Sequence, residues 1–73
     1  RPQFRVDCCG WQVDGDLWEW DYTVSDGART VMRLSKQLLN WTDTYLMAID
    51  RPEDALYCLM IVLAIDAAKC SRK

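Results

Sequence analysis

The stretch ALYCLMIVLAI, residues 55–65, decides the fold because every position in it is apolar. It follows Asp50-Arg51-Pro52-Glu53, a helix-start pattern with a capping Asp, a Pro in the first turn and an acid three residues after the cap. We therefore predict a helix over 51–70. A helix that is apolar on all sides must be covered on all sides. Either the rest of the domain wraps it, or it docks on a partner.

Length and composition indicate one small folded domain over 1–73. At 73 residues, a single core is marginal without cross-links or oligomerisation. The hydrophobic share of 51%, with four Trp, excludes a disordered chain. The net charge of −2 argues against a general binder of nucleic acid or of anionic membranes. The apolar run is shorter than the roughly 20 residues that span a bilayer, so we expect a soluble, cytoplasmic protein with a secreted one as the alternative.

Residues 3–24 resemble a β-hairpin. Asp14-Gly15 is a favoured two-residue turn, and after it three aromatic residues alternate with polar ones. The aromatic set is Trp18, Trp20 and Tyr22. The first half of the hairpin keeps its apolar residues on one face only if an extra residue lies near Cys9-Gly10. We therefore predict a β-bulge there, with the alternative that the strand simply ends at this point.

Residues 28–49 show apolar positions at helical spacing, which predicts a first helix. The positions are Val31, Leu34, Leu38, Trp41, Tyr45 and Ile49. Because only Asp50-Arg51 joins this helix to the next, the two should form an antiparallel hairpin. The expected fold is α+β of the ββαα type, in which the β-hairpin packs on two helices.

Two surfaces are candidate binding sites for another protein. One is an acidic face on the hairpin, formed by Asp14, Asp16, Glu19 and Asp21. The other is an apolar strip on the second helix, formed by Cys58, Ile61, Val62 and Ile65, which we expect to bind a partner or a second copy. The alternative for the strip is closure by the N-terminal strands.

The four cysteines, Cys8, Cys9, Cys58 and Cys70, leave two interpretations open. They are reduced and structural in a cytoplasmic protein, or they form one or two disulfides in a secreted one. Cys58 and Cys70 are too far apart along an intact helix to pair with each other. A metal site is not expected, because there is no His and no Cys-x-x-Cys.

The residue types argue against an enzyme and indicate no cofactor. There is no His for acid–base chemistry near neutral pH and no glycine-rich phosphate loop. We therefore expect a small interaction module that recognises another protein, of phage or bacterial type, acting as a regulator or inhibitor. Direct nucleic-acid binding and membrane binding are not expected. The alternatives are an inhibitor whose acidic face mimics nucleic acid, and a secreted, disulfide-linked helical effector.

Overall fold

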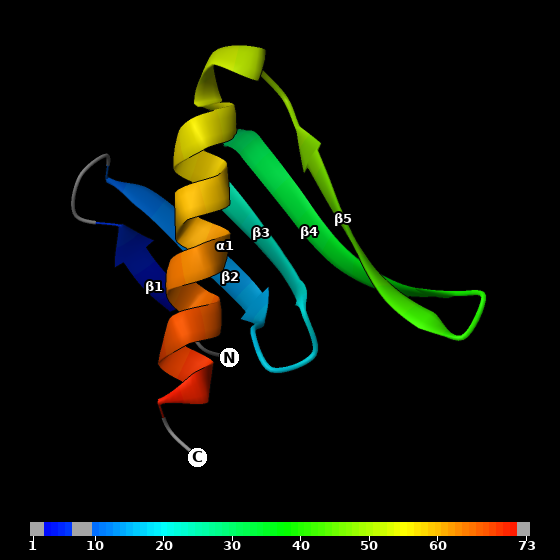
Figure 1. The fold of residues 1–73 in the computed structure, drawn as a ribbon. Helices are drawn as coiled ribbons and strands as arrows, with labels where there is room; N and C mark the ends of the chain where they lie inside the picture. The colour runs from blue at the N-terminus through cyan, green and yellow to red at the C-terminus, as the bar shows by residue number, and fades with distance from the viewer. Residues whose placement is uncertain (1–2, 7–9, 72–73) are drawn as a thin grey trace.

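The structure, a computed structural model, describes residues 3–6 and 10–71. It consists of a five-stranded antiparallel sheet in the order β1-β2-β3-β4-β5, followed by a helix that crosses one face of the sheet (Figure 1). The elements are β1 (Gln3–Val6), β2 (Trp11–Asp16), β3 (Asp21–Asp26), β4 (Arg29–Leu39), β5 (Thr42–Ile49), the 3-10 turn η1 (Pro52–Asp54) and α1 (Ala55–Cys70). The chain is therefore a β-rich α+β protein.

The predicted helix over 28–49 is wrong, and with it the ββαα arrangement. This segment forms β4 and β5, joined by a two-residue turn in which Asn40 and Trp41 have φ of 52° and 66°. Positive φ at both central residues is the requirement of a type I′ hairpin turn, for which Asn is well suited. A strand pair also extends the sheet beyond β3 and so satisfies its backbone hydrogen bonds, which a helix would leave open.

A bulge in β4 explains why its apolar pattern looked helical. Val24 is opposite Met32, whereas Ser25 is opposite Thr30, so Val31 is an extra residue between the two pairs. Val31 and Met32 are therefore both buried. An extra residue breaks the strict alternation of a strand and leaves a spacing that imitates a helix. The single first strand with a bulge near Cys9-Gly10 is wrong, because β1 ends at Val6 and pairs antiparallel with β2, which begins at Trp11. Gly10, which precedes β2, has φ of 71°.

The predicted turn at Asp14-Gly15 is also wrong. Both residues lie within β2, and the turn to β3 comprises residues 17–20. Gly15 is needed for a different reason, because a Cβ there would lie 2.6 Å from the Asp21 carbonyl oxygen and 2.8 Å from the Tyr22 Cα. Glycine is therefore required because two strands come too close for a Cβ at this position, and not because the chain turns there.

The predicted helix over 51–70 is confirmed in type and position, as η1 and α1 together cover Pro52–Cys70. Its expected cap is not formed, since no side chain caps either η1 or α1. The Asp50 carboxylate instead accepts a hydrogen bond from Arg29 at 3.2 Å. Pro52 does stand at the beginning of the helical segment.

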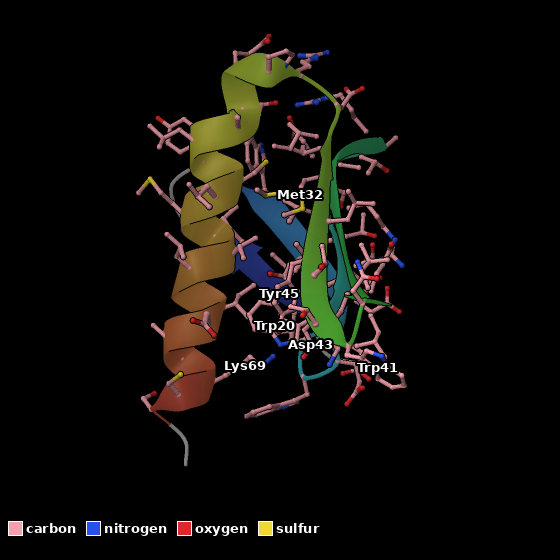
Figure 2. All side chains as sticks on the ribbon, turned by 45° about the vertical axis from the view of Figure 1, so that its right-hand side comes forward. Trp20, Met32, Trp41, Asp43, Tyr45 and Lys69 are labelled. Atoms are coloured by element: carbon pink, nitrogen blue, oxygen red, sulfur yellow. The ribbon has the colours of Figure 1, made fainter. Side chains whose placement is uncertain are left out.

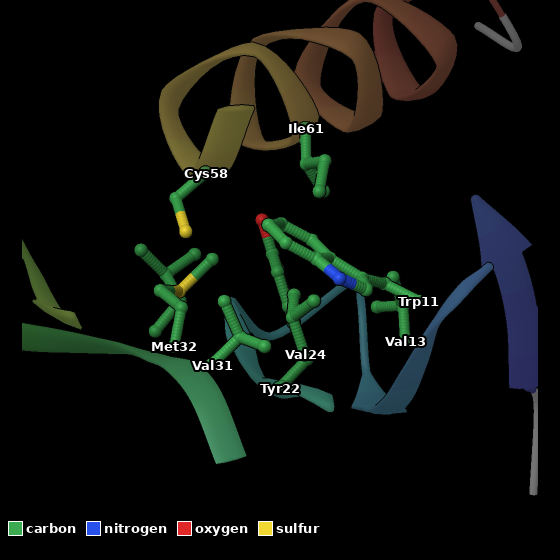
Figure 3. Close-up of a cluster of buried hydrophobic side chains, with 9 residues drawn as sticks. Trp11, Val13, Tyr22, Val24, Val31, Met32, Cys58 and Ile61 are labelled. Atoms are coloured by element: carbon green, nitrogen blue, oxygen red, sulfur yellow. The ribbon is translucent and has the colours of Figure 1, made fainter. Parts of the chain in front are cut away.

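The core lies between the sheet and the inner side of α1 (Figure 3). It takes its side chains from β2, β3, β4 and α1. The buried residues are Trp11, Val13, Tyr22, Val24, Val31, Met32, Leu34, Cys58 and Ile61. Figure 3 shows Cys58 and Ile61 directed from the helix toward the side chains of the sheet.

Candidate functional site

Helix α1 carries two apolar stripes on opposite sides. The inner stripe, Cys58, Ile61, Val62 and Ile65, is the strip that the sequence suggested for partner binding. The structure places it against the sheet, with Cys58 and Ile61 buried and the other two packed on the core. In this fold the inner stripe is core, so it is not available to another protein.

The outer stripe is the open apolar surface of the helix. It consists of Leu56, Leu59, Met60 and Leu63, whose exposed fractions run from 43% to 66%. At 3.6 residues per turn these four positions lie roughly opposite the inner stripe. No charged residue occurs between Ala55 and Ile65. A surface helix normally has a polar outer face, so an apolar outer face of this size is unusual.

Charged residues lie at both ends of the inner side of α1. They are Asp54 and Lys69, and a charge at such a position usually indicates a solvent-facing side. In the structure both find partners inside the molecule, Asp54 with Arg29 and Lys69 with the β2–β3 turn. A charge with an intramolecular partner does not mark a solvent-facing side, so these two residues do not indicate from the sequence which stripe is exposed.

Arg29 holds the beginning of the helix against the sheet. Its guanidinium lies 3.2 Å from the Asp50 carboxylate, 3.5 Å from Asp54 and 3.9 Å from Asp26. Arg29 is the first residue of β4, so these contacts connect the end of the sheet with η1. Each exposed pair contributes little alone, but three acids around one partly buried cation fix the position of that cation.

Lys69 holds the other end of the helix. Its Nζ donates to the carbonyl oxygens of Leu17 at 2.9 Å and Trp18 at 3.3 Å. The same ammonium lies 3.7 Å from the centre of the Trp20 ring, which in turn packs on Tyr45 at 4.8 Å (Figure 2). Burial lowers the pKa of Lys69, while Asp66 acts in the opposite direction. The contacts orient α1 so that the inner stripe faces the sheet.

The acidic residues lie at the β2–β3 end of the sheet. Asp16 and Asp21 are paired across the two strands, and the Glu19 N–H donates to Asp16 at 3.1 Å. Asp14 lies two residues from Asp16 on the same strand. Arg33 forms an ion pair with Asp21 and so offsets part of the charge. The structure therefore places Asp16, Glu19 and Asp21 together at this end of the sheet, with Asp14 further along β2.

Two titratable groups, Tyr22 of β3 and Cys58 of α1, are buried between the sheet and the helix. Burial raises the pKa of Tyr22 to about 12, and the nearby Asp66 carboxylate adds to this shift. The Tyr22 hydroxyl has no hydrogen-bond partner among the described residues. Burial also raises the pKa of the Cys58 thiol, and Asp54 adds to this shift while Arg29 opposes it. A thiol with a raised pKa is a poor nucleophile.

Within residues 3–6 and 10–71 there is no group of three His, Cys, Asp or Glu side chains that could hold a metal ion. In the same part of the chain, no helix is long and apolar enough to cross a membrane. Cys58 and Cys70 are free thiols, the first buried and the second exposed. The remaining two cysteines lie outside the described residues.

Sequence reasoning missed the tip of the β4–β5 hairpin. Trp41 is 93% exposed there, and Leu38 and Leu39 are exposed beside it. Figure 2 shows Trp41 at the end of the hairpin, apart from the helix. The available signal was Asn40, a residue that favours positive φ, in the middle of a predicted helix.

The chain is similar in sequence to a longer bacterial protein. Over 66 residues, which is 90% of this chain, the sequence is 36% identical to Uncharacterized protein YxjI of Bacillus subtilis (strain 168). The chain spans 41% of the length of that relative. No protein-family model matches the chain, and no solved structure matches it.

Proposed function

We propose that this chain is a non-enzymatic association module that docks through the outer stripe of α1. The observation that supports the proposal is the exposure of Leu56, Leu59, Met60 and Leu63 on a helix whose opposite side already forms the core. Burying apolar area gives about 25 cal/mol per Å², so covering these four side chains would contribute favourably to docking. A reducing compartment such as the cytoplasm suits a module with a free thiol in its core.

The covering surface is itself apolar and belongs to a folded protein. The relative is more than twice as long as this chain, since the chain spans 41% of it. In a protein of that length, the surface can come from the remainder of the same polypeptide. Where the remainder of the polypeptide does not cover the outer stripe, the covering surface comes from a separate protein. Either source would use the outer stripe in the same way.

The acidic residues are a weaker basis for a function. The ion pair between Asp21 and Arg33 removes part of the charge that a basic partner would recognise. Exposed charges also contribute to the rate of association and its salt dependence more than to affinity. We therefore base the proposal on the helix.

Photo-crosslinking tests the proposal. A benzophenone amino acid replaces Met60 in the outer stripe, and a matched control carries it at Thr30, an exposed position on β4. After irradiation in cells of the native source, the benzophenone at position 60 should form a discrete adduct, which mass spectrometry identifies. The adduct should be lost when Leu63→Glu is added, because a charge prevents burial of the stripe.

The position of the adduct identifies the covering surface. Within a longer polypeptide it would indicate the remainder of the same protein, and to another protein it would indicate a separate partner. Equal labelling from positions 60 and 30, or labelling that survives Leu63→Glu, would contradict the proposal. Circular dichroism of Leu63→Glu confirms that the variant still folds.

A further inference from the structure

Strand β5 is the edge of the sheet, and in the described part of the chain nothing pairs with its outer side. Its register with β4 is regular over eight residue pairs, from Met32 opposite Ile49 to Leu39 opposite Thr42. No bulge interrupts this register. The edge is therefore a continuous row of backbone groups.

The hydrogen bond from the Asp50 N–H to the Val31 carbonyl, at 3.0 Å, fixes which groups are unpaired. In an antiparallel pair, alternate residues bond to the neighbouring strand. Even-numbered residues of β5 therefore bond to β4, and odd-numbered ones direct their N–H and C=O outward. The outward set is Asp43, Tyr45, Met47 and Ile49. Such a row is a template for an additional strand.

Strand β5 lacks the features that usually prevent edge pairing. Its sequence, TDTYLMAI, contains no Pro, no Lys and no Arg, and its single charge is Asp43. Leu46 is 52% exposed on the face of the sheet opposite α1, as its register position between Tyr45 and Met47 requires. An edge of this kind is open to another strand.

We propose that β5 pairs with β5 of a second copy of this chain, antiparallel and centred on Leu46. In this register the outward residues of the two strands meet, with Tyr45 opposite Met47 and Asp43 opposite Ile49. The two Leu46 side chains meet at the two-fold axis as a non-hydrogen-bonded pair, in which side chains come closest. The strand is thus complementary to itself.

The charges agree with the same register. Arg51 continues the extended backbone beyond β5, with φ of −123° and ψ of 127°. Asp43 of one copy then lies diagonally across from Arg51 of the other, within reach of a long side chain. Among the described residues Asp43 has no ion-pair partner of its own. The pairing supplies one at each end of the interface.

This interface is separate from the outer stripe. It joins two sheets edge to edge and leaves Leu56, Leu59, Met60 and Leu63 exposed, so the two docking surfaces can be tested independently.

Cysteine crosslinking tests the register. In a background with Cys8, Cys9 and Cys70 changed to Ser, Leu46→Cys should form a disulfide-linked dimer on mild oxidation. Peptide mapping should show position 46 joined to position 46. Leu39→Cys is the matched control, because Leu39 is exposed on β4 rather than on the edge strand. It should give no dimer.

Sedimentation measures the energy of the pairing. Leu46→Lys should weaken dimerisation about tenfold or more, because it places like charges opposite each other at the axis. Leu39→Lys introduces the same charge away from the axis and should leave the dimer intact. A monomer at high micromolar concentration would overturn the proposal. A dimer that crosslinks through Met60→Cys and not through Leu46→Cys would also overturn it. Leu46→Lys should not change the photo-crosslink from Met60, which keeps this inference distinguishable from the proposed function.

Discussion

The two sides of α1 carry similar apolar residues, but only one is covered. Cys58 and Ile61 on the inner side are buried, whereas Leu56, Met60 and Leu63 on the outer side are exposed. Hydrophobicity therefore does not decide which side meets the sheet. The contacts of Arg29 at one end and Lys69 at the other set the orientation of the helix. The outer side is then left exposed.

The comparison predicts unequal costs for neighbouring residues. Ile61→Ala should reduce the free energy of unfolding by about 2 to 5 kcal/mol, because it leaves a cavity between the helix and the sheet. Met60→Ala, one residue earlier and on the outer side, should cost under about 1 kcal/mol, because Met60 is exposed. Urea denaturation of dilute monomer measures both values.

Equal costs for the two variants would contradict the assignment of inner and outer sides. The same measurement at high protein concentration sharpens the comparison. Association stabilises the folded state. At high protein concentration, Met60→Ala should therefore lower the free energy of unfolding more than it does in dilute solution only if the outer stripe has become covered.

A second prediction uses the buried hydroxyl on the inner side. Tyr22 has a pKa of about 12 in the folded protein, against a usual value of 10.0. Below pH 10 both folded and unfolded chains keep the proton. Between pH 10 and pH 12 the unfolded chain loses it first, so stability falls as pH rises, by about 2 to 3 kcal/mol in total. Chemical denaturation across this range measures the loss.

Tyr22→Phe is the control for that experiment. It should remove this part of the pH dependence, since Phe has no proton to lose. At neutral pH it should be as stable as the original chain or more stable by about 1 kcal/mol, because the hydroxyl has no partner among the described residues. An unchanged slope above pH 10 would show that the hydroxyl is hydrated.

The C-terminal helix could be predicted from the sequence because its signals are local. Pro52 and the uninterrupted apolar run define its position without reference to the rest of the chain. Which side it buries could not be predicted, because that depends on Arg29 and Leu17, residues distant in sequence.

The β4–β5 hairpin could not be predicted for a related reason. The bulge at Val31 produces a helix-like spacing, and only the pairing of Met32 with Val24 reveals it. Leu38 and Trp41 extended that spacing although neither is part of the core. These exposed apolar residues therefore favoured the spacing of a helix over the alternation of a strand. The ion pair between Asp21 and Arg33 could not be predicted either, because it depends on the register between β3 and β4.

Trp41 extends the comparison from the helix to the hairpin, because it too is a large apolar residue that the fold leaves uncovered. Its φ of 66° is strained for any residue with a Cβ, at a cost of roughly 1 to 2 kcal/mol. Trp41→Gly should remove that strain and, after the entropy that glycine loses on folding, raise the free energy of unfolding by about 1 kcal/mol. Asn40→Gly is the matched control and should gain less, because Asn already tolerates positive φ. Thermal and urea denaturation of both variants measure the difference. A loss of stability in Trp41→Gly would mean that the exposed indole stabilises the isolated chain. The exposed apolar residues would then differ in their contribution to stability, because those on the outer side of α1 are expected to contribute little.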